Sequence, residues 1–251
     1  MAGLKSRSST DGKPAPTKRP ARTAKARSPY QRAQRDRGAD TRAQLIEAAL
    51  DVFGRLGFEG ASTREIAKAA GVNLAAIAYH FGGKEALYLA VAEHVAGSIA
   101  ARIGATIVAV GAPTSIADAG AARDALGRLI ETLIDVMLGA AEAQCWARFI
   151  VREQMQPTAA FDVIYRFMNG AAEVATRLVA VALGQAEAAE TRLRVIAMFG
   201  QVLIFRVAHA LVLRSMQWRE IGDTERAMIR RIVLDQIDAI LTTGRSPGEG
   251  K

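Results

Sequence analysis

The segment STREIAKAAGVNLAAIAYHFGGKEALY, residues 62–88, contains the signals from which the architecture of this chain can be inferred. Ser62 and Glu65 have the spacing of a capping box, in which two side chains bind backbone N–H groups at the start of a helix. Gly71 follows two turns later and suits a tight turn. Residues 74–81 predict a second short helix, which two glycines then end. Two short helices joined by a glycine-containing turn are typical of a helix-turn-helix unit.

A helix-turn-helix unit places its second helix in the major groove of DNA, while neighbouring residues hold the phosphates. Tyr79 and His80 stand at the far end of that helix, where phosphates flank the groove. Lys84 begins the next helix, where its side chain and the free backbone N–H groups suit a phosphate. The residues that this pattern places at DNA are Ser62, Arg64, Ala75, Ala76, Ala78, Tyr79, His80 and Lys84. A purely structural interpretation stays open, because a capping box needs no DNA and a Tyr-His-Phe triplet is often part of a core.

Helical periodicity extends over most of the remaining chain, and no segment alternates convincingly as a strand would. A first helix is predicted from near Thr41 with Gly57 as its stop, and another from Lys84 to about residue 110. The C-terminal helices are predicted at residues 118–140, 142–155, 158–184 (with Asn169-Gly170 as a candidate break), 187–216 and 223–243. The fold class is therefore all-α. The predicted parts are an N-terminal three-helix helix-turn-helix domain at 40–88, a larger C-terminal helical domain at 111–244 and a frayed end at 245–251.

The positive charge of the chain is concentrated before the first predicted helix. The formal net charge is +8, and residues 1–40 alone contain 11 basic and 3 acidic residues. The remaining chain has 22 basic and 22 acidic residues, which excludes a generally basic nucleic-acid coat. Residues 1–39 are rich in Lys, Arg, Ser, Thr and Pro and are expected to be disordered. Two interpretations of this tail stay open: a basic arm along DNA phosphates, and a solvated leader that never touches DNA.

Other functional classes receive little support from the composition. The single cysteine, Cys145, excludes an internal disulfide framework and favours a reducing, cytoplasmic location. The longest apolar run, Val195–Leu213, contains Gln201 and Arg206, which are costly in a membrane, so it is expected to be buried in protein. The sequence has no metal-ligand spacing, phosphate-binding loop or dinucleotide fingerprint. No metal, cofactor or enzymatic activity is therefore expected, and a helical enzyme remains a weaker alternative.

Residues 41–90 resemble the N-terminal domain of the TetR family of bacterial transcriptional regulators. The matching segments are LIEAALDVFGRLGFEGASTREIAKAAGV (45–72) and IAYHFGGKEALY (77–88). The resemblance implies that Tyr79, His80 and Lys84 contact the DNA backbone. It also implies that residues 73–78 read bases, which adds Asn73 and Leu74 to the expected DNA contacts. The chain departs from the family at Ala76 and Ala78, where polar side chains are common. Specificity is then expected to depend on contacts with thymine methyl groups, on DNA shape, or on the basic tail.

The segments RFIVREQMQPTAAFDVIY (148–165) and VLDQIDAIL (233–241) resemble the branch of this family with a CerR/CecR-like C-terminal domain. The resemblance implies a ligand-binding and dimerisation domain, and therefore a homodimer that binds a palindromic operator as a repressor and is released by a small-molecule effector. A non-specific DNA-binding protein acting through its basic tail is the alternative.

Two sets of residues follow from this resemblance. The candidate effector pocket comprises Trp146, Phe149, Arg152, Met155, Tyr165, Phe167, Met168 and His209, with Arg148 as a further polar candidate. The candidate dimer interface comprises Val195, Met198, Phe199, Val202, Phe205, Val212, Met216, Ile229, Val233 and Ile237. The interface residues form two stripes at helical spacing, and both stripes fit the chain's own core equally well.

Overall fold

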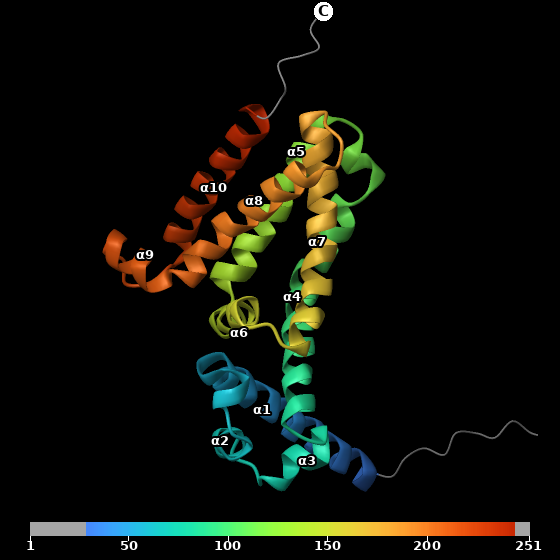
Figure 1. Cartoon of the computed structure of the whole chain (residues 1–251), viewed down its shortest axis with the longest axis vertical. Helices are drawn as coiled ribbons and strands as arrows, with labels where there is room; N and C mark the ends of the chain where they lie inside the picture. The colour runs from blue at the N-terminus through green and yellow to red at the C-terminus, as the bar shows by residue number, and fades with distance from the viewer. Residues whose placement is uncertain (1–28, 244–251) are drawn as a thin grey trace, which may run out of the picture. The chain divides into compact units, whose positions relative to one another are not determined.

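The computed structural model of the chain describes residues 29–243, and every regular element in that range is helical (Figure 1). The elements are α1 (Pro29–Gly60), α2 (Thr63–Ala69), α3 (Ala75–Phe81), α4 (Lys84–Val110), η1 (Pro113–Ile116), α5 (Ala119–Ile134), η2 (Asp135–Gly139), α6 (Ala143–Met155), α7 (Ala159–Leu183), α8 (Ala189–Val207), α9 (His209–Met216) and α10 (Asp223–Thr243). The predicted all-α fold class is thus confirmed. The predicted disorder of residues 1–28 and the predicted frayed end concern parts of the chain outside the described residues.

Helix α1 begins earlier than the sequence indicated. The predicted start near Thr41 is wrong, since the helix extends back to Pro29, and residues 29–39 are not irregular. Proline is favourable at the first helical position, and the following Gln, Arg and Ala residues have good helix propensity. The expectation of disorder gave too much weight to the shortage of apolar residues. Gly57 does end the regular part of α1, because its φ of 77° and ψ of 178° leave the helical region.

The short helices form as their capping signals predicted. The Ser62 hydroxyl accepts a hydrogen bond from Glu65 N at 3.1 Å at the start of α2. The Asn73 side-chain oxygen accepts one from Ala75 N at 2.9 Å and so begins α3. Gly82 ends α3 in the left-handed conformation, with a φ of 84°. Their shared core consists of buried apolar residues from four helices: Leu45, Ala49, Val52, Phe53, Ile66, Ile77, Leu87 and Val91.

Helices α4, α5 and α7 form the centre of the C-terminal part, where each packs against the other two (Figure 1). The predicted helix at 118–140 ends in a π-helical turn, η2, and α7 continues through Asn169-Gly170 without a break. The predicted single helix at 187–216 is wrong. The chain bends by 73° at Ala208, which divides this segment into α8 and α9.

Helix α4 is long and apolar enough to cross a membrane by length and composition, and the bent pair α8–α9 passes the same test when it is counted as one segment. The core helices of soluble proteins meet these criteria too, and 44% of the apolar window of α4 is buried inside the protein. The apolar character of α4 is accounted for by its packing against α5 and α7.

Candidate nucleic-acid interface and effector cavities

Helix α3 presents one face to solvent and one to the core. Tyr79 is 85% exposed, and Leu74, Ala75 and Ala78 are also exposed, whereas Ile77 is buried. The predicted outward position of Ala76 is wrong, because this residue is half-buried and packs against the core. The reason is that α3 packs on both α2 and α4, so its buried face is wider than Ile77 alone.

Polar and aromatic groups surround the exposed face of α3. Ser62 and Asn73 use their oxygen atoms as helix caps. The Ser62 hydroxyl proton and the Asn73 amide N–H groups remain able to donate. His80 is half-buried, with its ring centroid 5.0 Å from that of Tyr79 and 6.3 Å from that of Phe81. Arg64 is exposed on α2.

Two cations lie over aromatic rings at the ends of this unit. The Lys84 ammonium is 4.5 Å from the ring centroid of Phe58, which holds it beside the first turn of α4. The Arg42 guanidinium is 5.0 Å from the ring centroid of Phe81, the last residue of α3. Sequence reasoning missed Arg42. The one sequence feature that could have indicated Arg42 was its position, four residues after Gly38 and just before the apolar stripe of α1 begins.

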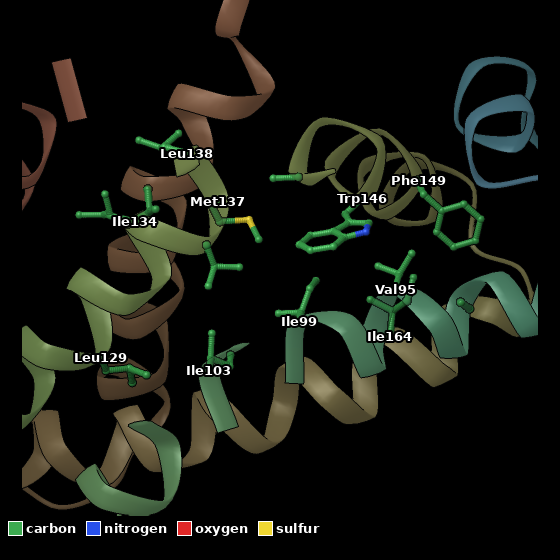
Figure 2. Close-up of a cluster of buried hydrophobic side chains, with 14 of the residues drawn as sticks. Val95, Ile99, Ile103, Leu129, Ile134, Met137, Leu138, Trp146, Phe149 and Ile164 are labelled. Carbon is green, nitrogen blue, oxygen red and sulfur yellow. The ribbon is translucent and has the colours of Figure 1, made fainter. Parts of the chain in front are cut away.

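The C-terminal part contains an apolar cavity of about 90 Å³ among α4, α5, α6, α7 and α8. Figure 2 shows Ile99 and Ile103 of α4 on one side of this region and Leu129 and Met137 on the other. Of the predicted pocket residues, Phe167 and Met168 line the cavity, as does Phe199 from the predicted interface. The assignment of three others to the lining is not supported: Trp146 and Phe149 are buried in the adjoining core, and Tyr165 is exposed on α7.

The remaining predicted pocket residues lie elsewhere, in an open cleft of about 550 Å³ between α6 and the α8–α9 bend, with Gly54 of α1 at its edge. Arg148, Arg152, Met155 and His209 line this cleft, together with Arg206. Sequence reasoning treated Arg206 only as an argument against a membrane span. In the structure its Nε donates to the carbonyl of Met137 at 2.7 Å, and burial lowers the pKa of its guanidinium. The predicted pocket residues that line a cavity are therefore divided between two separate cavities.

A buried polar network connects α4 with α6. The Tyr88 hydroxyl donates to the carboxylate of Glu153, which is 1% exposed. That carboxylate also accepts from the backbone N of Thr158 at 3.1 Å and from its hydroxyl. Burial, together with the hydrogen bond to Glu153, raises the pKa of Tyr88. Among the described residues, no three His, Cys, Asp or Glu side chains converge as metal ligands.

The predicted dimer stripes belong mainly to the chain's own core. Val195, Met198, Val202, Ile229, Val233 and Ile237 are at most 3% exposed in the single chain. Phe199, Phe205 and Val212 are half-buried, and only Met216 is clearly exposed. Helical spacing predicts that a stripe is buried but not which surface covers it, and here α8 and α10 pack on α5 and α7.

Other faces of the same helices carry exposed apolar side chains. Ile196, Ile204, Val207, Leu211, Met228 and Ile232 are each between 39% and 65% exposed. They come from α8, α9 and α10, and large exposed apolar patches in proteins commonly mark interaction sites.

Comparisons with known proteins agree with both halves of this architecture. Residues 45–91 match the family model for bacterial regulatory proteins of the tetR family. Residues 122–243 match the model for the C-terminal domain of the HTH-type transcriptional dual regulator CecR. CecR of Shigella flexneri is 35% identical over 214 residues, which cover 82% of this chain and 93% of that protein.

Solved structures share the fold at lower identity. AibR in complex with isovaleryl coenzyme A and operator DNA has a TM-score of 0.59 and 14% identity, over 78% of this chain and 97% of that one. FadR from Bacillus subtilis in complex with stearoyl-CoA has a TM-score of 0.55 and 17% identity, over 81% and 99%. The curated relatives are transcriptional regulators rather than enzymes. With its helix-turn-helix unit, its helical C-terminal domain and this relationship to CecR, the chain belongs to the TetR family of bacterial transcriptional regulators.

Proposed function

We propose that this protein is a ligand-responsive repressor that binds a palindromic operator as a homodimer and is released from it by a small-molecule effector. The observation that carries the proposal is the exposed face of α3, where Tyr79 projects into solvent beside the small residues Ala75 and Ala78. A surface of this kind fits the major groove closely and leaves the α3 core face undisturbed.

The proposed DNA contacts divide by role. Ser62 and Arg64 at the start of α2 face the backbone of one strand, and Tyr79, His80 and Lys84 face that of the other. Arg42, held at the end of α3 by Phe81, is a further candidate for a phosphate contact. Asn73 is the main hydrogen-bonding side chain available to base edges, while Ala75 and Ala78 offer methyl contacts to thymine. Sequence discrimination is therefore expected to rest on A·T-rich steps and on DNA shape.

A homodimer is supported by the exposed apolar residues of α8, α9 and α10. A twofold axis through this surface would pair the same residues from both copies, as symmetric dimer interfaces require. Two α3 helices related by the same axis would read two half-sites of opposite orientation, which is why a palindromic operator is proposed. A protein with this task works on chromosomal DNA, so we place it in the cytoplasm.

The effector is proposed to be a molecule with an apolar group that enters the cavity lined by Ile103, Met137 and Phe167. The cavity has room for a group of a few carbon atoms, and its Met137 and Met168 side chains can rearrange to admit a larger one. AibR has isovaleryl coenzyme A bound in its structure and FadR has stearoyl-CoA, so an acyl group is the first candidate, and the volume of the cavity favours a short one.

In vitro selection from a random duplex pool tests the DNA-binding part without a known operator. The full chain should enrich an inverted repeat, and a chain lacking residues 1–28 should enrich the same one. A flat sequence distribution for the full chain, with binding lost in the shortened chain, would instead identify a non-specific protein acting through its tail. Transcription in vitro from a promoter that overlaps the selected site then distinguishes repression from activation, because a repressor lowers the yield of transcript.

A further inference from the structure

The cleft between α6 and the α8–α9 bend has a charge arrangement that neither the DNA interface nor the apolar cavity uses. Arg148 and Arg152 come from α6, Arg206 from α8 and His209 from α9, and all four line the same space of about 550 Å³. No Asp or Glu is among the described residues that line it. Three guanidinium groups around one cavity repel one another unless an anion lies between them.

The partners of these arginines leave most of the positive charge uncompensated. Arg152 Nη2 donates to the backbone carbonyl of Arg55 at 2.8 Å, and Arg206 donates to a backbone carbonyl as well. Carbonyl groups satisfy the N–H donors but carry no net charge. Arg148 pairs with the Asp51 carboxylate only at 3.9 Å, and Asp51 is also paired with Arg55 at the shorter distance of 2.9 Å.

The rest of the lining is largely apolar and includes Val151, Met155 and Val207. We propose that this cleft is a second ligand site, which binds an amphipathic carboxylate with its charged group between Arg148 and Arg152 and its apolar body along Val151 and Val207. A guanidinium group matches the planar, two-oxygen geometry of a carboxylate. The volume is within the range of small-molecule sites in proteins.

Occupancy of this site is linked to the DNA-binding domain through Arg152. Its hydrogen bond to the Arg55 carbonyl holds the last helical turn of α1 just before Gly57. A bound carboxylate competes for the same guanidinium N–H groups and so loosens this attachment of α6 to α1. The site is separate from the apolar cavity, and the binding step does not depend on the proposed repressor function.

Calorimetric titration of the full chain with sodium hexanoate, at constant ionic strength, tests the site. Hexanoate should bind saturably, and the neutral analogue 1-hexanol and inorganic phosphate should each bind about tenfold more weakly or worse. Arg148→Gln and Arg152→Gln should each lower hexanoate affinity by about tenfold or more. Arg166 is exposed on the surface of α7, so Arg166→Gln is the matched control and should leave hexanoate affinity unchanged. Circular dichroism melting verifies that the variants fold.

Several outcomes would overturn the proposal. Equal binding of 1-hexanol, equal binding of phosphate, or unchanged affinity in both cleft variants would each exclude an amphipathic carboxylate site here. Hydrogen exchange of residues 52–58 tests the link to α1. Hexanoate should speed exchange in the wild type, and Arg152→Gln should exchange fast without ligand; no change in either case would refute the link. Neither assay contains DNA, so a negative result leaves the proposed operator binding untouched.

Discussion

Gly57 occupies a backbone conformation that other residues avoid. Its φ of 77° and ψ of 178° lie in a region populated almost only by glycine, and a Cβ there would be 2.8 Å from Arg152 Nη1. We expect Gly57→Ala to lower the free energy of unfolding by about 1–3 kcal/mol, measured by urea denaturation. Gly54→Ala is the control, because Gly54 is helical and a Cβ there would lie 3.5 Å from Arg148 Cβ of α6, which is an ordinary van der Waals contact. Similar losses in both variants would contradict the argument.

Tyr88 makes the stability of the protein depend on pH at the alkaline end. Its raised pKa means that the folded protein holds the hydroxyl proton more tightly than the unfolded chain does. The resulting stabilisation is complete below the ordinary tyrosine pKa of about 10 and is lost as the pH rises above it. Tyr88→Phe should be less stable at neutral pH by about 1–3 kcal/mol, since Glu153 loses a donor, and its stability should fall less steeply from about pH 9 to 11. Parallel urea-unfolding profiles across that range would rule this out.

At the scale of elements, α3 and the first turn of α4 should act as a unit that positions DNA. Lys84→Ala and Tyr79→Phe remove predicted phosphate contacts, so binding to the selected operator and to random DNA should weaken in parallel. For Lys84→Ala, the slope of log affinity against log salt should shrink by about 1. Fluorescence anisotropy across a salt series measures both quantities, with Arg166→Ala as the control on α7. An unchanged slope for Lys84→Ala would mean that this lysine does not face a phosphate.

The elements differ in how well their sequences predicted them. The bounds of α2, α3 and α4 followed from Ser62, Asn73 and paired glycines, because caps are local chemistry that needs no tertiary contact. The bend at Ala208 had no such marker, since no Pro or Gly stands there, and it arises where the chain turns away after packing on the core. The same limit applies to the interface, where periodicity identified Val202 as buried but could not tell a partner subunit from the chain's own α5 and α7. Periodicity also could not separate core from cavity lining among the aromatic residues: Trp146 is buried in the core, whereas Phe167 lines the apolar cavity.

At the scale of the whole molecule, the exposed apolar residues of α8–α10 should hold the dimer together. Ile204→Asp and Ile232→Asp should give folded monomers in sedimentation, because a carboxylate buried without a partner costs about 3–5 kcal/mol. Val202→Asp should instead abolish cooperative unfolding, since Val202 is fully buried within one chain. Val108→Asp alters an exposed apolar residue of α4 and serves as the control. If both Ile204→Asp and Ile232→Asp still sediment as dimers, the interface lies elsewhere.

The basic tail outside the described residues should add affinity rather than specificity. Residues 1–28 contain eight basic residues and one acidic residue and precede the start of α1. Their removal should lower operator affinity at low salt and make its salt dependence shallower, while folding and dimerisation are unchanged. Operator titrations of the full and shortened chains at several salt concentrations compare the two. Equal affinities throughout would identify the tail as a solvated leader.

The small side chains on α3 also bear on how such a regulator diverges. Ala75 and Ala78 are exposed and take no part in the core, so larger side chains can be added there without repacking the domain. After gene duplication, one or two codon changes at these positions would give a copy with a new DNA preference and an unchanged C-terminal domain. The same property makes the chain a starting scaffold for engineered DNA-binding proteins, in which operator preference is varied at two sites and the C-terminal domain is left as it is.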